Sequence, residues 1–252
     1  MSIINNNLSF YDCNAFIGVH ENPYIDSPFE PELLNSAMKS SATKGALVYQ
    51  SAAVVYDASF GNDLLIEKIK GNNDLAPVFV ASPELCFAQK DVEKFFQQIK
   101  KYNISAVKIF PRYNNYDITS GIIDRLFPFL NDEKILLLAN QEEITWKEIE
   151  YILNKFKSLP FLLQSTGYRM ERLLNPFFAK YKNFYFDISR YHVHGGIEYL
   201  CKEFGSERIL YGSGMPIFSP EPLMIMVSKA DISLEEKQNI SSKNLLRLIN
   251  HE

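Results

Sequence analysis

The sequence predicts an α/β fold, a single-domain (β/α)8 TIM barrel with an extra C-terminal helix. Short apolar runs rich in β-branched and aromatic residues alternate with longer amphipathic segments, which is typical of repeated βα units around a parallel sheet. Eight such units occur in 252 residues, and this is the size of a (β/α)8 barrel. No low-complexity linker or charge block divides the chain, so we take residues 1–252 as one domain. A doubly wound open sheet stays an alternative, because periodicity does not distinguish closed from open sheets.

Eight segments are expected to form the strands. Most are apolar throughout, as expected when helices cover the outside of a barrel and packed side chains fill its inside. The segments are Leu8 to Phe16, Gly45 to Gln50, Pro77 to Ala81, Ser105 to Phe110, Lys134 to Asn140, Phe161 to Gln164, Asn183 to Ile188 and Arg208 to Gly212.

The helices are expected between these strands and after the last one. Apolar residues recur at helical spacing in the intervening segments. Ser233 and Glu236 form a capping-box pattern that starts a final helix, which we expect to close the barrel wall. The other helices are predicted at Pro31 to Ser41, Asn62 to Lys70, Lys90 to Tyr102, Gly121 to Leu130, Trp146 to Lys157, Met170 to Tyr181, Gly196 to Phe204 and Pro222 to Lys229.

Composition favours a small-molecule partner. A net charge of -4 gives no general attraction to nucleic acid or to an anionic membrane. No signal-peptide pattern and no apolar run long enough to span a bilayer is present, so we expect a cytoplasmic protein. The cysteines Cys13, Cys86 and Cys201 are far apart and lack the spacing of a zinc or redox site. A homo-oligomer is left open.

The site is expected at the carboxyl ends of the strands, where parallel barrels place their functional residues. The residues at or just after the predicted strands are densely polar. They are Asp12, Asn14, Lys108, Arg112, Asn140, Gln164, Ser165, Tyr168, Arg169, Asp187, Ser189, Arg190, His192 and Ser213.

Four cations in this set predict an anion-binding pocket. Lys108, Arg112, Arg169 and Arg190 come from strands or following loops that converge on one barrel mouth. Guanidinium groups recognise carboxylate or phosphate through paired hydrogen bonds. We expect an anionic small molecule as the ligand, bound by these arginines with Asn14, Asn140, Gln164, Tyr168, His192 and Ser213. The alternative is that each cation pairs locally with a carboxylate or is solvated.

Three residues are the candidates for catalysis. Lys108 is expected to provide positive charge, and a barrel lysine with a lowered pKa can also act as a Schiff-base nucleophile. Asp12 and Asp187 are the candidates for general acid and base. The alternative for both aspartates is structural ion pairing.

Three segments resemble one known family. Tyr11-Asp12-Cys13-Asn14-Ala15-Phe16-Ile17-Gly18 fits the frame Asp-x-His-x-His-x-Gly, and Arg208-Ile209-Leu210-Tyr211-Gly212-Ser213-Gly214-Met215-Pro216 is similar to Arg-Ile-Leu-Phe-Gly-Ser-Asp-x-Pro. The tail Asn244-Leu245-Leu246-Arg247-Leu248 is similar to an Asn-x-x-Arg-Leu ending. These segments resemble the amidohydrolase-related family of the amidohydrolase superfamily. The resemblance implies a TIM-barrel, metal-dependent hydrolase.

The same segments depart from the family at its metal ligands. Asn14 and Phe16 stand where that family has histidines, and Gly214 stands where it has an aspartate. The family's other histidines would fall near Asn140 and near Gln164 or Ser165. A catalytic zinc site needs about three protein ligands. We therefore expect no metal and no cofactor.

The resulting hypothesis is an amidohydrolase-like, metal-independent enzyme, either a hydrolase of esters or lactones or a lyase that decarboxylates an anionic substrate. Preorganised cations can stabilise a developing oxyanion without supplying an activated hydroxide. One alternative is a catalytically inactive barrel that binds a ligand or a partner. A second alternative is a divalent metal such as Zn²⁺ at a displaced site built from His192, His194 and Asp187.

Overall fold

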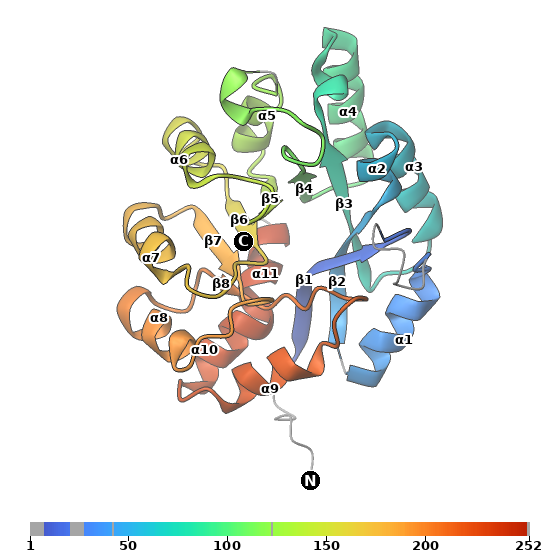
Figure 1. Ribbon diagram of the computed structural model, residues 1–252. Coiled ribbons are helices and arrows are strands. Elements are labelled where there is room, and N and C mark those ends of the chain that lie inside the picture. The colour runs from blue at the N-terminus through green and yellow to red at the C-terminus, as the bar shows by residue number, and fades with distance from the viewer. Residues whose placement is uncertain (1–7, 21–27, 42, 122, 251–252) are drawn as a thin grey trace.

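Eight parallel strands form the sheet of this protein, in the order of the chain. The computed structural model describes residues 8–20, 28–41, 43–121 and 123–250. Figure 1 shows the strands surrounded by helices, as the sequence predicts. The strands are β1 (Phe10–Ile17), β2 (Thr43–Gln50), β3 (Leu75–Ala81), β4 (Ala106–Ile109), β5 (Leu136–Asn140), β6 (Phe161–Gln164), β7 (Phe184–Asp187) and β8 (Ile209–Leu210).

Backbone hydrogen bonds between β1 and the segment after β8 bring the two ends of the sheet together. Cys13 N donates to Tyr211 O at 3.0 Å, and Gly214 N donates to Asn14 O at 2.9 Å. Ala15 and Met215 form an isolated parallel bridge. The sheet is therefore a barrel, and the carboxyl ends of all its strands meet at one mouth.

The helices follow the predicted segments closely. Two of them, α1 and α8, have the predicted bounds. The helices are α1 (Pro31–Ser41), α2 (Ala52–Val55), α3 (Ala58–Lys68), α4 (Gln89–Lys101), α5 (Phe127–Asp132), α6 (Trp146–Lys155), α7 (Glu171–Lys180), α8 (Gly196–Phe204), α9 (Glu221–Lys229), α10 (Leu234–Gln238) and α11 (Asn244–Asn250), with the short segments η1 (Pro83–Cys86), η2 (Ile118–Ser120) and η3 (Asn239–Lys243). Sequence analysis missed α2, η1 and η2.

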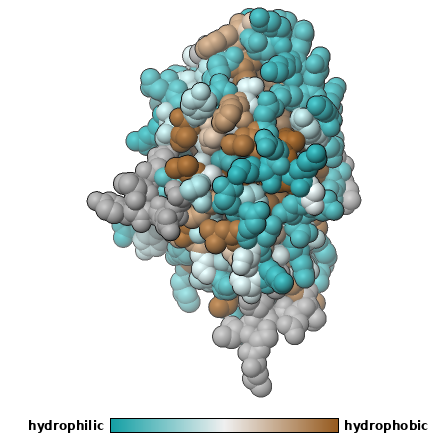
Figure 2. Space-filling model, turned by 90° about the vertical axis from the view of Figure 1, so that its right-hand side faces the viewer, coloured by the Kyte–Doolittle hydropathy of each residue, from teal (hydrophilic) through white to brown (hydrophobic). Residues whose placement is uncertain are grey.

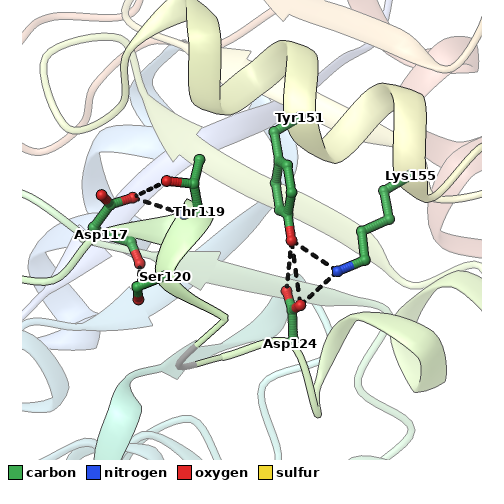
Figure 3. Close-up of polar contacts among 6 residues, drawn as sticks. All are labelled: Asp117, Thr119, Ser120, Asp124, Tyr151 and Lys155. Atoms are coloured by element: carbon green, nitrogen blue, oxygen red, sulfur yellow. Dashed lines mark hydrogen bonds and ion pairs between the residues drawn. The ribbon is translucent and has the colours of Figure 1, made fainter.

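The predicted helix from Gly121 to Leu130 is wrong over its first half. Turns occupy the described residues before α5, which begins at Phe127. Pro128 explains the late start, because it has no N–H to donate to the carbonyl of Asp124. Asp124 instead accepts hydrogen bonds from Tyr151 Oη at 3.2 Å and Lys155 Nζ at 2.5 Å, both on α6 (Figure 3). The turn is thus fastened to a neighbouring helix.

The final helix is also interrupted. The capping box of Ser233 and Glu236 is present and starts α10. The π-helical segment η3 then separates α10 from α11. Ile240 O in η3 accepts a hydrogen bond from Tyr211 N at 2.9 Å, next to the seam between β8 and β1. The predicted role in closing the wall is therefore performed by η3.

The inside of the barrel is apolar towards its amino end. The apolar cluster there includes Leu47, Val78, Ala106 and Leu162, and α11 adds Leu245 to it. A separate and larger cluster lies between the strands and the surrounding helices. Helix α11 therefore packs its apolar residues against the barrel interior.

Further along the strands the interior becomes polar. Lys108 follows Ala106 by two positions on β4, and Gln164 follows Leu162 by two positions on β6. Side chains two apart on a strand point to the same face. The polar residues therefore form a layer inside the barrel, between the apolar cluster and the mouth.

The outer surface seen in Figure 2 mixes hydrophilic and hydrophobic residues. Large apolar side chains are exposed on several helices, among them Leu33 on α1, Val55 on α2 and Phe60 on α3. Scattered apolar side chains of this kind are ordinary on protein surfaces. Within the described ranges, no helix is long and apolar enough to cross a membrane.

Asn244 is expected to stabilise the packing of α11. Its Nδ2 donates to Ser206 O at 2.7 Å and to Ile209 O at 2.8 Å, and the side chain is fully buried. We expect Asn244→Ala to lower the free energy of unfolding by about 2 kcal/mol, because two buried carbonyls lose a donor. Urea unfolding followed by the fluorescence of Trp146 measures this. The exposed neighbour Lys243 provides the control; an equal loss in Lys243→Ala would contradict the assignment.

Candidate functional site

A cavity of about 850 Å³ opens at the carboxyl ends of the strands. It is the place where the sequence predicts a site, and residues from β1, β2, β4 and β5 and from the following loops surround it. The lining residues are Asn14, Phe16, Val19, His20, Tyr49, Ser51, Val54, Val55, Lys108, Phe110, Arg112, Tyr113, Asn140, Glu142, Glu143, Ser165, Arg190, Gly214, Ile217 and Phe218.

Lys108 lies deep in this cavity. Its side chain is 2% exposed, and Nζ lies 4.6 Å from the centre of the Tyr49 ring and 5.3 Å from that of Phe110. Among the residues that the structure describes, no carboxylate lies within ion-pair distance of this amine. Burial lowers the pKa of Lys108 to about 8, against the opposing attraction of Asp187. The amine is thus held by aromatic faces.

Asp187, at the end of β7, is the centre of a buried hydrogen-bond network. Oδ1 accepts from Ser165 N at 2.9 Å and from Ser189 Oγ at 2.8 Å. Oδ2 accepts from Asn14 Nδ2 at 3.0 Å. The side chain is fully buried, and it is absent from the cavity lining. Asp187 therefore lies beneath Asn14 and Ser165, which do reach the cavity.

A register shift in β1 allows two consecutive residues, Cys13 and Asn14, to contact Asp187. The pairing of β1 with β2 shifts register between Asp12 and Ala15. Cys13 Sγ lies 4.0 Å from Asp187 Oδ2, and Asn14 Nδ2 donates to the same atom. Neighbouring side chains of a regular strand point to opposite faces. The bulge therefore allows Asn14 to join the site, whereas burial raises the pKa of Cys13 and disfavours its thiolate.

Asp12 is buried at the seam between β1 and the segment after β8. Oδ1 accepts from Asn14 N and from Ser213 N, both at 2.9 Å, and Ser213 Oγ donates to Oδ2. Burial raises the pKa of Asp12 to about 7, although these hydrogen bonds oppose the shift. Asp187 repels the Asp12 anion, and burial likewise raises the pKa of Asp187. Asp12 and Ser213 are both absent from the cavity lining.

Two of the predicted arginines lie at the cavity, on its exposed side. Arg190 pairs with Glu142 at 3.6 Å and lies 5.8 Å from the centre of the Phe218 ring. Arg112 Nη1 lies 3.4 Å from Glu142 O. Arg190 is thus paired with a local carboxylate, as the alternative expects, and it also lines the cavity.

The other predicted binding residues divide into two groups. Asn140 lines the cavity, and its Oδ1 is buried without a hydrogen-bond partner among the described residues. Gln164 is buried and donates to Cys13 O. Arg169 and Tyr168 are exposed, stack on each other at 5.2 Å, and are absent from the cavity lining. His192 is likewise exposed and absent from it.

Sequence reasoning missed the aromatic wall of the cavity. Phe16 and Tyr49 stack with ring centres 5.7 Å apart, and Tyr49 lies 5.4 Å from Phe110. Phe218 lines the outer part. These rings lie at the strand ends or in the loops that follow, so their position in the sequence alone could have predicted that they line the cavity.

The donors present do not fit a divalent metal. No group of three or more His, Cys, Asp or Glu side chains suited to a metal ion occurs among residues 8–20, 28–41, 43–121 and 123–250. Asn14 turns its amide nitrogen, which cannot coordinate a cation, towards Asp187. His192 and His194 are exposed whereas Asp187 is buried, so the displaced site is not assembled.

Comparisons with known proteins find likeness in structure only. No family model and no curated protein matches the sequence. Similar structures include 2,6-dihydroxybenzoate decarboxylase from Rhizobium, with 11% identity over 97% of this chain and 99% of that one and a TM-score of 0.72. An amidohydrolase II protein matches with 13% identity, 96% and 99% coverage and a TM-score of 0.76. A 5-carboxyvanillate decarboxylase from Novosphingobium aromaticivorans, complexed with manganese and 4-hydroxy-3-methoxy-5-nitrobenzoic acid, matches with 12% identity, 96% coverage of each chain and a TM-score of 0.72.

What these proteins share with this chain is the fold. The predicted single-domain (β/α)8 barrel is thereby confirmed. It is a barrel also found in amidohydrolases and decarboxylases, as the resemblance of the terminal motifs implies.

Asp12 is expected to give stability a distinct pH dependence. Its raised pKa means that the folded protein binds this proton more tightly than the unfolded chain does. Protonated Asp12 therefore makes its full contribution to the free energy of unfolding below about pH 4. This contribution is lost as the pH rises towards about 7, a change of about 3 to 4 kcal/mol. We expect Asp12→Asn, which mimics the protonated acid, to lack this part of the slope.

Urea unfolding between about pH 4 and about pH 8 measures the difference between the two proteins. The exposed Asp231 gives a matched control, Asp231→Asn, whose slope should equal that of the unsubstituted protein. Parallel slopes for Asp12→Asn and the unsubstituted protein would contradict the raised pKa.

Proposed function

We propose that this chain is a metal-independent lyase that decarboxylates an anionic, ring-bearing small molecule, with Lys108 as its central catalytic residue. The observation that carries the proposal is a single buried amine between aromatic faces in the cavity of the barrel mouth.

The aromatic wall favours a flat, apolar ligand body. Phe16, Tyr49 and Phe110 form a continuous set of ring contacts on one side of the cavity. Aromatic side chains prefer offset or edge-to-face contacts with other rings. Ligand pockets commonly combine such apolar walls with a few polar groups that fix orientation. This cavity has that composition.

The cations favour a negatively charged ligand. Lys108, Arg112 and Arg190 line the cavity, and the acidic residues Glu142 and Glu143 line it too. Glu142 is engaged by Arg190, which leaves Lys108 as the deep charge with no carboxylate partner in the described part of the chain. A charge in a site shielded from water acts more strongly than one at the surface. An anion that enters is therefore drawn to the base of the cavity.

Decarboxylation suits this arrangement better than hydrolysis does. Hydrolysis needs an activated water, and the candidates Asp12 and Asp187 are covered by protein hydrogen bonds and do not line the cavity. In decarboxylation the bond between the carboxyl carbon and its neighbour breaks, CO2 leaves, and the electron pair moves towards a substrate oxygen. The Lys108 ammonium stabilises that oxygen, and a proton then replaces CO2 on the carbon. We assign Asp187 to positioning Asn14 and Ser165.

The structural neighbours support the proposal indirectly. Two of the proteins named above are decarboxylases of aromatic carboxylates. One of them was solved with manganese, so the metal-free chemistry proposed for this chain is a departure from it. We also propose a cytoplasmic small-molecule enzyme without a cofactor, a setting in which the buried free thiols of Cys13, Cys86 and Cys201 stay reduced.

Removal of the Lys108 charge should abolish turnover. Lys108→Met keeps the length of the side chain and removes its charge, so we expect kcat/KM to fall by about 10²–10³-fold or more. Release of CO2 from 2,6-dihydroxybenzoate, other hydroxybenzoates and 3-oxo-3-phenylpropanoate is the measurement. Lys100→Met, at an exposed surface ion pair with Glu133, is the control and should leave the rate unchanged.

Two outcomes would contradict the proposal. Equal rates in Lys108→Met and the unsubstituted protein would exclude Lys108 from the reaction. Binding of these acids without CO2 release from any of them would favour the inactive, ligand-binding barrel instead.

A further inference from the structure

The environment of Lys108 is unusual for a lysine. Its side chain is almost completely buried, yet Nζ has neither a carboxylate within ion-pair distance nor a hydrogen bond among the described residues. Buried charges are ordinarily paired, because an unpaired charge is costly to desolvate. The ring faces of Tyr49 and Phe110 compensate only in part. This environment therefore favours the neutral, nucleophilic amine more than a surface site does.

A second polar group in the same cavity lacks a partner. Asn140 Oδ1 is buried without a hydrogen bond from the described residues, and Asn140 lines the cavity. Asn140 is on β5, next to β4, and each of the two residues follows a barrel-interior apolar residue by two positions. The side chains of Lys108 and Asn140 therefore face the same interior space. A buried acceptor without a donor suggests a ligand that supplies one.

From these two groups we infer that Lys108 forms a covalent imine with a carbonyl-bearing ligand, and that the substrate is a β-keto acid carrying a ring. The second part rests on the proposed decarboxylation, whereas the first part does not. Asn140 Oδ1 accepts a hydrogen bond from the carbinolamine hydroxyl or from the protonated imine N–H. Neither group needs a metal or a cofactor for this role.

The chemistry is balanced by the ligand and water alone. The neutral amine of Lys108 adds to the ketone carbon to give a carbinolamine, which takes up one proton from water and loses one water molecule to give the protonated imine. The bond to the carboxyl carbon then breaks, CO2 leaves, and its electron pair moves onto the imine nitrogen to give an enamine. Protonation at carbon and hydrolysis of the imine release the ketone and restore Lys108. The imine is the electron sink, which a fixed ammonium provides less effectively.

The groups facing Lys108 determine when its amine is neutral. Asp187, Cys13, Glu143 and Glu142 act on it electrostatically, and each favours its charged form. Burial outweighs them and lowers the pKa to about 8. Imine formation should therefore become faster as the pH rises from about 7 to about 9, because the neutral fraction increases over that range.

Borohydride trapping with benzaldehyde tests the covalent step without requiring decarboxylation. We expect the unsubstituted protein to gain one benzyl group, equal in mass to the aldehyde minus water plus two hydrogens, on the peptide that contains Lys108. Intact-mass and peptide mass spectrometry measure this. Lys101→Met, at an exposed lysine of α4, should be labelled at Lys108 to the same extent.

Lys108→Arg separates covalent from electrostatic action. Arginine keeps the positive charge but forms no imine, so we expect loss of the Lys108 label and a fall of CO2 release from 3-oxo-3-phenylpropanoate to the uncatalysed rate. Near-ultraviolet circular dichroism shows whether this larger side chain is accommodated. Lys108→Met, which is smaller, gives the same test of labelling if it is not.

The outcomes distinguish the two proposals. CO2 release that persists in Lys108→Arg, or an unlabelled Lys108 in the active protein, overturns the covalent inference and leaves electrostatic decarboxylation standing. Labelling of Lys108 without CO2 release from any acid supports the covalent carbonyl site and overturns decarboxylation. Labelling together with release, both lost in Lys108→Arg, supports decarboxylation through the imine and replaces the electrostatic role of the Lys108 ammonium.

Discussion

The structure depends on the buried carboxylate of Asp187 more than on any other single group. It accepts hydrogen bonds from Ser165 on the β6 side, from Ser189 after β7 and from Asn14 on β1. Gly212 lets the segment after β8 approach it, because a Cβ there would lie 2.6 Å from Asp187 Oδ2. A buried carboxylate must be satisfied in this way or it is very costly. The requirement fixes four neighbouring parts of the barrel relative to one another.

That constraint separates the acids of this barrel from its reactive amine. The carboxylate oxygens of Asp12 and Asp187 accept hydrogen bonds from backbone and side-chain donors, so these two residues form the floor of the site. Lys108 lies in the cavity above them, with its amine beside the rings of Tyr49 and Phe110. Had either carboxylate paired with Lys108, the amine would be a fixed cation with an elevated pKa. Lys108 is therefore free to react because the hydrogen-bond donors around Asp12 and Asp187 hold these carboxylates away from its amine.

Much of this could be predicted from the sequence, since strand ends in a parallel barrel converge whatever their side chains are. That rule placed Lys108, Asn14 and Asn140 together at one mouth. It failed for Arg169, where a positive φ of 67° turns the loop in a way that residue types do not reveal. The rule also does not tell which of these residues line the cavity and which lie beneath it. Asp187 and Asn14 are hydrogen-bonded neighbours, yet only Asn14 lines the cavity. That difference depends on the bulge in β1, which has no signature in the residue pattern.

The positions where the resembling family keeps metal ligands are occupied here by residues that are integrated into other packing. Phe16 stacks on Tyr49 and contacts Phe29 edge-on at 5.7 Å, so its ring is part of the cavity wall. Gly214 has a φ of 79°, and a Cβ there would meet Phe218 at 2.9 Å. A histidine in place of Phe16 would thus remove a ring from the cavity wall, and an aspartate in place of Gly214 would clash with Phe218. Phe16 is therefore part of the aromatic wall, and Gly214 leaves the space that the Phe218 ring occupies.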